Sequence, residues 1–387
     1  MIRELAITMA YINLVGCTAP QSDQAGVADS AGIRIVTGPP DDLSASWRVV
    51  EVTRLGENDP EHPLSLVAHP EVIGADLTGR VVLYNELAER VEVYSPGGQL
   101  LGARGRKGGG PGEYQFPGTL TVDPDGSISL VDYGKNAIIA FDAVGNVLPQ
   151  RSFATLAYPY GGIRFWGDTA ILQTREATAD GPVHTLRLVA PGVDTVLMTL
   201  VTATLGQAQF QCPGFTITLS GAEVLFAPEL TWVVAGRTLI AAAQDRYEVR
   251  VFRGAKRSLI IRRPFAKRPV EAEHVSLLYP DGRVVGRAPC RKQAPELAAK
   301  FGVASLLPVL GRVASAPDGS VWVERYALPG DEQVMDIFSP EGVYFGTITG
   351  AGFPVGFVKG GRFVGLEWDQ ETGAHRVSVY RLAPPPW

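Results

Sequence analysis

The segment GRKGGGPGEYQFP (Gly105–Pro117), together with TLTVDPDGSISLVDYGKNAIIAFDAVGNV (Thr119–Val147), shows a pattern that recurs along the chain. In each copy a turn glycine precedes a short apolar strand: Gly79 (GRVVLY), Gly126 (GSISLV), Gly167 (GDTAIL), Gly236 (GRTLIA), Gly319 (GSVWVE) and Gly361 (GRFVGL). The shortest steps between these glycines are 41, 42 and 47 residues, which is typical of one four-stranded propeller blade. Six copies therefore predict an all-β fold, a six-bladed β-propeller.

A second strand-and-turn unit supports this prediction. It reads RVEVYSPGGQLLG from Arg90, AIIAFDAVGNVLP from Ala137 and VMDIFSPEGVYFG from Val334. Each copy places an aromatic residue before a glycine turn and a further apolar strand: Tyr94, Phe141 and Phe338. Alternation of apolar residues in such strands predicts that one face of each blade packs against the next blade.

The chain ends supply the strands that close the ring. The last unit, from Gly361 to Leu382, is too short for four strands, whereas apolar runs at Ile33–Val36 and Trp47–Leu55 precede the first repeat. Pairing of the two ends would remove exposed sheet edges. We therefore expect an N-terminal strand to close the last blade, with residues 33–387 forming one propeller.

Two long steps between the repeat glycines, 69 and 83 residues, require insertions, which we place near residues 202–222 and 264–308. The second insertion contains a predicted helix at Pro295–Phe301, with proline in its first turn and Gly302 as its end. Long insertions in a rigid scaffold tend to carry binding residues. The second insertion is thus the better candidate for a functional segment.

Positive charge gathers in the same region. The whole chain of 387 residues has a net charge of -5, but Arg250 to Lys292 holds 12 Lys or Arg residues against three acidic ones. The densest basic cluster is Arg262, Arg263, Lys267 and Arg268. Such a cluster fits an anionic glycan, a lipid head group or an acidic protein; the alternative is a solvated blade edge that charge protects from aggregation. A broad basic surface for nucleic acid is not indicated.

The N-terminus carries the features of an export signal. Arg3 precedes a mostly apolar run from Leu5 to Val15, which is too short to span a bilayer and leads to Leu14-Val15-Gly16-Cys17. Residues 1–17 resemble a bacterial lipoprotein signal with its lipobox, which implies cleavage before Cys17 and acylation of that residue. Residues 18–32 would then be a flexible tether. The alternative is an ordinary N-terminal segment with a buried cysteine.

Gly105 to Val147 also resembles an NHL repeat, through Pro117, Asp123-Pro124-Asp125-Gly126, Val131-Asp132 and Asn136. The whole chain is similar to six-bladed propeller lipoproteins of Gram-negative bacteria. For most of that group the resemblance implies a fold but no proven activity. From the lipobox we expect an exported chain, lipid-anchored in the cell envelope at the outer membrane, and we expect a monomer. The lipobox and the absence of catalytic motifs favour a binding or scaffold module for a protein or anionic glycan, without a cofactor.

The two remaining cysteines, Cys212 and Cys290, form an even pair, and both lie beside proline. An oxidising compartment would permit a disulfide between them. Two separately buried thiols are the equal alternative, because sequence does not give the Cα separation that a bridge requires.

Sequence motifs for catalysis and metal binding are missing. The chain has no HExxH, no Cys/His ligand spacing, no GxSxG elbow, and no GK[ST] after the glycine-rich segment, so we predict no metal site. The alternative function is a metal-dependent lactonase-like or lyase-like propeller enzyme with Ca²⁺ on its axis. Its candidate ligands also satisfy the turn chemistry of the repeat: Asp76, Asn85, Asp123, Asp132 and Asn136.

Overall fold

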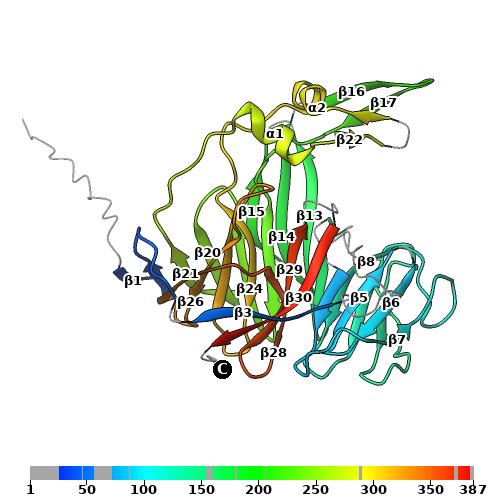
Figure 1. Ribbon diagram of the computed structural model, residues 1–387, viewed down its shortest axis with the longest axis vertical. Helices are drawn as coiled ribbons and strands as arrows, with labels where there is room; N and C mark the ends of the chain where they lie inside the picture. Colours follow the sequence, from blue (N-terminus) through cyan, green and yellow to red (C-terminus); the bar gives the residue numbers. More distant parts are fainter. Residues whose placement is uncertain are drawn as a thin grey trace, which may run out of the picture.

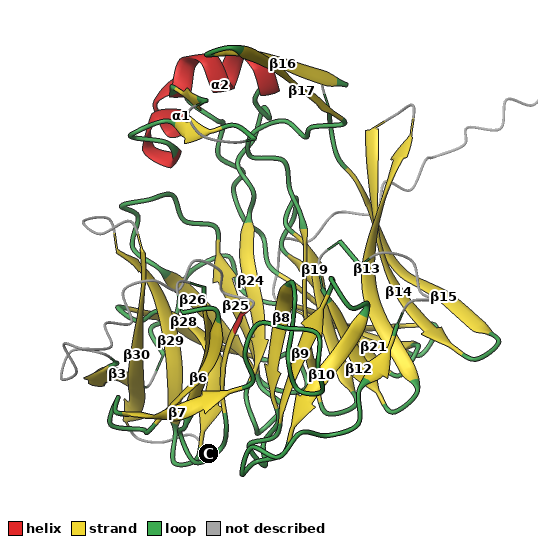
Figure 2. Ribbon diagram, turned by 90° about the vertical axis from the view of Figure 1, so that its right-hand side faces the viewer, coloured by secondary structure: helices red, strands yellow, loops and turns green. Residues whose placement is uncertain are grey.

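The chain is a six-bladed β-propeller that carries a small cap (Figures 1 and 2). The computed structural model describes residues 26–387 except 46, 56–71, 87, 154–158, 161, 179–180, 205, 287–289, 370–373 and 384–387. None of the described helices is long and apolar enough to cross a membrane. The predicted all-β, six-bladed fold is confirmed.

Each blade is an antiparallel sheet whose first strand lies nearest the ring axis. Blade 1 contains β4 (Ile73–Ala75), β5 (Val81–Asn85), β6 (Arg90–Tyr94) and β7 (Leu100–Arg104). Blade 2 contains β8 (Pro117–Val122), β9 (Ile128–Asp132), β10 (Ala137–Phe141) and β11 (Arg151–Ser152). Blade 3 contains β12 (Ile163–Trp166), β13 (Thr169–Thr178), β14 (Gly181–Ala190) and β15 (Val193–Val201).

The other three blades follow the same plan. Blade 4 contains β18 (Leu230–Ala235), β19 (Thr238–Ala243), β20 (Glu248–Arg253) and β21 (Lys256–Arg262). Blade 5 contains β24 (Leu310–Ser315), β25 (Val321–Arg325), β26 (Val334–Phe338) and β27 (Tyr344–Thr349). Blade 6 contains β28 (Phe353–Val358), β29 (Arg362–Asp369), β30 (Ala374–Ala383) and β3 (Arg48–Arg54).

The repeat glycines set the register of the ring. All six lie in the turn between the first and second strands of a blade, with φ between 56° and 91°. Glycine adopts this left-handed conformation without the steric cost of a Cβ. The segment Gly105–Phe116 joins β7 to β8, so it links blades 1 and 2 as its place in the repeat indicates.

The ring closes through the N-terminal strand. Strand β3 pairs antiparallel with β30, so blade 6 takes its outer strand from the start of the chain, as predicted (Figure 1). The run at Ile33–Val36 has a different place: β2 (Ile33–Thr37) pairs in parallel with β21 of blade 4, and β1 (Gly26–Ser30) pairs with β2. Residues 26–32, expected in the tether, therefore belong to a hairpin that extends blade 4 to six strands.

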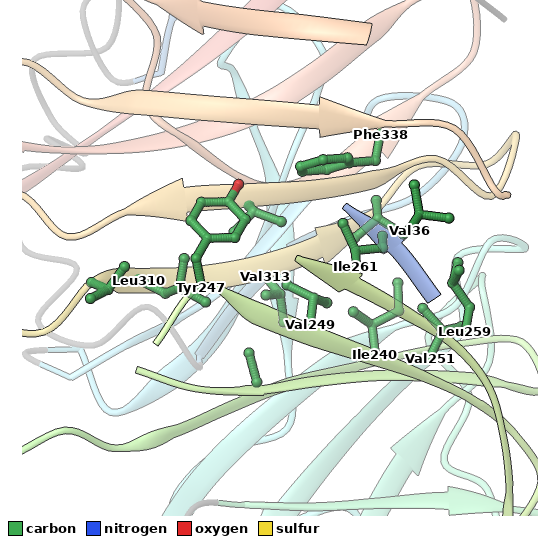
Figure 3. Close-up of a cluster of buried hydrophobic side chains, with 14 residues drawn as sticks. Val36, Ile240, Tyr247, Val249, Val251, Leu259, Ile261, Leu310, Val313 and Phe338 are labelled. Atoms are coloured by element: carbon green, nitrogen blue, oxygen red, sulfur yellow. The ribbon is translucent and has the colours of Figure 1, made fainter. Parts of the chain in front are cut away.

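Apolar clusters between neighbouring blades hold the ring together. The cluster between blades 4 and 5 contains Val249 and Ile261 on one side and Leu310 and Val313 on the other, with Val36 of β2 at its edge (Figure 3). Equivalent clusters lie at the other five junctions. The repeated aromatics Tyr94, Phe141 and Phe338 are at most 1% exposed in these clusters. Each blade thus buries both faces against its neighbours.

Both insertions combine into one unit, the cap. It contains β16 (Gln207–Cys212), β17 (Phe215–Ser220), α1 (Ala272–Leu278), β22 (Arg283–Val284), β23 (Arg291–Lys292) and α2 (Ala294–Phe301). The helix predicted at Pro295–Phe301 is confirmed as α2, with Gly302 as its C-cap. The insertions precede β18 and β24, so the cap lies at the end of the ring where first strands begin (Figure 2).

Candidate functional site

A cavity on the propeller axis is the candidate site, because residues from all six blades converge on it. Its volume is about 680 Å³, within the usual range for a small-molecule pocket. Its walls come from the opening residues of the first strands, so it lies toward the cap end of the ring. Representative residues are Ile73, Thr119, Arg164, Trp232, Arg312 and Phe353, one from each blade in order.

The lining combines aromatic faces with polar groups. Tyr133, Tyr160, Trp232 and Phe353 supply the aromatic rings. Among the described residues the charged lining consists of Arg164, Arg312 and Glu229. The site therefore offers flat apolar surfaces next to hydrogen-bonding groups.

Arg312 is held rigidly against the cavity wall. Its Nε and Nη2 atoms donate to the two carboxylate oxygens of Glu324, each at 2.9 Å. Its guanidinium also lies 4.1 Å from the ring centre of Phe353. A bidentate ion pair stacked on an aromatic ring fixes the side chain, so this part of the wall is preorganised.

A buried hydrogen-bond chain starts behind the cavity wall. Trp232 Nε1 donates to Gln173 Oε1 (3.3 Å), and Gln173 Nε2 lies 3.4 Å from His184 Nδ1. On the other side of its ring, His184 Nε2 donates to Glu223 Oε1 (3.1 Å). His184 is only 1% exposed, and Tyr160 packs edge-on against its ring at 5.3 Å. These hydrogen bonds orient two side chains of the lining, Gln173 and Trp232, from the side that faces away from the cavity.

Glu223 connects this chain to the cap. It follows β17 and accepts hydrogen bonds from Arg175 Nε and Thr202 Oγ1, each at 2.9 Å. Burial acts to raise the pKa of Glu223, but the hydrogen bonds from His184, Thr202 and Arg175 hold it below its usual value. The carboxylate is therefore a stable anion between cap and blade 3.

The four predicted basic residues have different environments. Arg262 is 47% exposed and pairs with Glu248 (2.8 Å), Lys267 is exposed, and Arg268 pairs with Asp331 (3.4 Å). Arg263 is 1% exposed in its side chain, so it offers almost no surface to a ligand. The cluster is thus three surface residues and one buried one.

Arg263 is the centre of a structural ion network. Its Nη1 donates to Asp336 Oδ2 (3.0 Å) and its Nη2 to Asp42 Oδ1 (2.9 Å). Asp336 is fully buried and also accepts from Arg325 and Tyr247. Burial acts to raise the pKa of Asp336, yet the pairing with Arg325 and the hydrogen bonds from Thr347 and Tyr247 lower it. Arg263, which directly follows β21, therefore links blade 4 to the N-terminal segment through Asp42 and to blade 5 through Asp336.

The five candidate metal ligands lie in turns and at strand ends. Asp76 accepts the backbone N–H groups of Thr78 (2.8 Å) and Arg80 (3.0 Å). Asp132 accepts those of four residues, Gln115, Phe116, Gly134 and Lys135. The described lining of the axial cavity contains none of the five: Asp76, Asn85, Asp123, Asp132 and Asn136. Within the described part of the chain, no three His, Cys, Asp or Glu side chains form a metal-binding group.

The cysteine pair lies within the cap. Cys212 at the end of β16 forms a disulfide with Cys290, and their Cα atoms are 5.1 Å apart. The bond joins the first insertion to the second across 78 residues of sequence. Phe210, Leu297 and Phe301 form a buried core beside it. Cys17, the predicted lipidation site, lies outside the described residues.

Sequence reasoning did not find the axial cavity or the Gln173–His184–Glu223 chain. The cavity residues are separated by tens of positions, and the ring geometry alone brings them together. One usable signal was polar or aromatic residues inside otherwise apolar first strands, such as Arg164, Trp232 and Arg312. For His184, its place within the apolar run of β14 was the only hint.

No family model and no curated protein matches the chain. A member of the DUF4221 family from Bacteroides vulgatus has a solved structure with TM-score 0.50 and 7% identity, covering 88% of this chain and 99% of that one. A Bacteroides fragilis protein named as a putative exported protein has a TM-score of 0.48 and 10% identity, covering 90% of this chain and 99% of that one. A streptogramin B lyase has a TM-score of 0.40 and 10% identity, covering 87% of this chain and 98% of that one. At these identities the likeness shows the propeller fold.

Proposed function

We propose that this protein is an exported, lipid-anchored propeller whose axial cavity binds a saccharide without catalysis. One observation carries the proposal: six blades together build a cavity of 680 Å³ that combines aromatic faces with fixed polar groups. A sugar ring has apolar C–H faces and a rim of hydroxyl groups. Such a ligand matches a pocket that offers apolar surfaces beside convergent hydrogen-bonding groups.

The wall around Trp232 and Tyr160 is the best candidate for stacking. Tyr160 is 52% exposed although it is aromatic, and Trp232 lines the same cavity from the neighbouring blade. The hydrogen bond from Trp232 to Gln173 holds the indole in place before any ligand arrives. Preorganisation of this kind lowers the entropic cost of binding.

The experiment is a titration of the protein against an array of neutral and acidic mono- to tetrasaccharides, followed by calorimetry on the best probe. We expect Trp232→Ala to weaken binding at least about tenfold, which corresponds to 1.4 kcal/mol. Phe345→Ala is the matched control, because Phe345 is an exposed aromatic (44%) on blade 5 outside the cavity. No binding across the array, or unchanged affinity of Trp232→Ala, would overturn the proposal.

The proposed membrane localisation of the protein is tested separately. We expect the wild-type chain to be acylated and to fractionate with membranes, and Cys17→Ser to be unacylated. Acyl chains together with a second membrane contact give stable anchoring. Mass spectrometry of the mature N-terminus checks this, and a wild-type protein without acyl groups would refute the anchor.

A further inference from the structure

The place where the described chain begins is fixed relative to blade 4. Gly26 opens β1, the outermost strand of the six-stranded sheet, and lies opposite Thr37 of β2. Thr37 in turn lies opposite Arg262 at the end of β21. Eight residues separate Cys17 from Gly26, so the span between the two is at most roughly 30 Å in any conformation. An anchor at Cys17 therefore keeps this rim of blade 4 close to the membrane.

A groove of about 380 Å³ lies on that same rim. Thr37 is part of its lining, which places it directly beside the point where the tether joins the propeller. Its surface cations are Arg246, Arg262 and Lys267. The side chains of Arg246 and Arg262 are 54% and 47% exposed, and Lys267 is exposed as well. These three side chains can reach a ligand outside the protein.

The groove remains positive after its ion pairs are counted. Arg246 contacts Asp245 (3.3 Å), which lies outside the lining. Its one carboxylate, Glu248, is only 12% exposed and is shared between Arg250 and Arg262. Arg263, also in the lining, is neutralised by buried Asp336. Phe265 adds a partly exposed ring (37%) next to Lys267. Basic groups around an exposed aromatic ring are the chemistry that suits an anionic bilayer interface.

We propose that this groove, the blade 4 rim, docks on the head groups of an anionic lipid bilayer and orients the propeller on the membrane. The inference rests on the proposed anchor at Cys17 for its biological setting, although the docking itself needs no acyl chain. An acyl anchor and a basic patch would act together, since each contributes to residence on the membrane. Saccharide binding in the axial cavity is a separate event.

The test uses the full chain carrying Cys17→Ser, so that no acyl group contributes. Sedimentation is measured with vesicles of phosphatidylglycerol mixed with phosphatidylcholine and with vesicles of phosphatidylcholine alone. We expect binding to the anionic vesicles only, weakening as salt is raised. Each basic residue near an anionic surface contributes roughly fivefold in affinity, so the triple variant Arg246→Gln, Arg262→Gln, Lys267→Gln should lose at least about tenfold.

The chain offers a matched control of equal charge. Arg106→Gln, Lys107→Gln and Arg151→Gln remove three exposed cations that pair with Glu113, Glu89 and Asp168 on other blades. This variant should bind like the parent, and circular dichroism verifies that both triples are folded. The proposal is overturned by equal binding to neutral vesicles, by equal losses in both triples, by no vesicle binding, or by binding to soluble heparin without binding to vesicles.

Discussion

The propeller ring and the cap are stabilised in different ways. The ring buries an apolar cluster at each of its blade junctions. It is closed by the pairing of β3 with β30, two strands from opposite ends of the sequence. The cap has a single core around Leu297 and Phe301, which reaches Leu328 in the β25–β26 loop of blade 5, and a disulfide joins its two halves. Its link to blade 3 includes the polar contacts of Glu223. We therefore expect the ring to unfold cooperatively and the cap to open first.

The largest effect is expected inside the ring, at the buried ion network. Arg263→Ala leaves Asp336 buried and short of a partner, which costs about 3–5 kcal/mol of unfolding free energy. Arg262→Ala is the adjacent control, and its exposed ion pair is worth about 1 kcal/mol or less. Urea unfolding measures both. Similar losses for the two variants would show that Arg263 is not a structural residue of the ring.

The next effect distinguishes the cap from the ring. Removal of the disulfide in Cys212→Ser, Cys290→Ser releases a long loop and should cost about 2–4 kcal/mol. Hydrogen exchange should show loss of protection in α1, α2, β16 and β17, with the strands of blades 1 and 6 unchanged. Cys17→Ser, which leaves the disulfide intact, serves as the control cysteine variant. Equal loss of protection in cap and ring would mean that the two fold as one unit.

A smaller effect is expected from the junction between the two regions. Glu223→Gln replaces an anion that accepts from Arg175, Thr202 and His184, and should cost about 1–3 kcal/mol of cap stability. Asp331→Asn, in an exposed pair with Arg268, should change stability by about 1 kcal/mol or less. Exchange rates of the cap amides measure both. A larger loss of cap stability in Asp331→Asn than in Glu223→Gln would show that the main contact between the cap and the ring is with blade 5.

The smallest effect is a difference in acid sensitivity. The pKa values of Glu223 and Asp336 are lowered in the folded protein, so their stabilisation is complete above the ordinary values of 4.5 and 3.8 and is lost as pH falls through the folded values. The pKa of Asp42, which joins the network around Arg263, is lowered from 3.8 to about 2, so its contribution to the ring is lost only as the pH approaches that value. On acidification, cap amides should therefore lose protection at a higher pH than ring amides. The opposite order would contradict the assignment.

The ring was predictable because its information is local and repeated. Gly79 and Gly319 fix equivalent turns, and the short final unit required β3. Strand β2 was not predictable as part of blade 4, since an apolar run pairs equally well with any open sheet edge. The seven-residue helix α1 was also missed. Its short stretch has no strong helical start signal beyond Glu271.

Site residues were harder to predict because their partners are distant in sequence. Arg263 was grouped with Arg262 as a surface cation, but its main partners, Asp336 and Asp42, lie 73 and 221 residues away. One hint was Asp336 itself, an acid within the apolar strand VMDIF. A charge on the buried face of a strand needs a partner of opposite charge. That argument predicts a buried cation, without saying which one.

The most direct test of the account is differential hydrogen exchange with the saccharide that binds best in the array. Ligand in the axial cavity should protect the first strands β12 and β18, around Arg164 and Trp232, and should leave the amides of the blade 4 rim unchanged. Protection confined to the cap helices or to the outer strands, with β12 and β18 unaffected, would contradict axial binding.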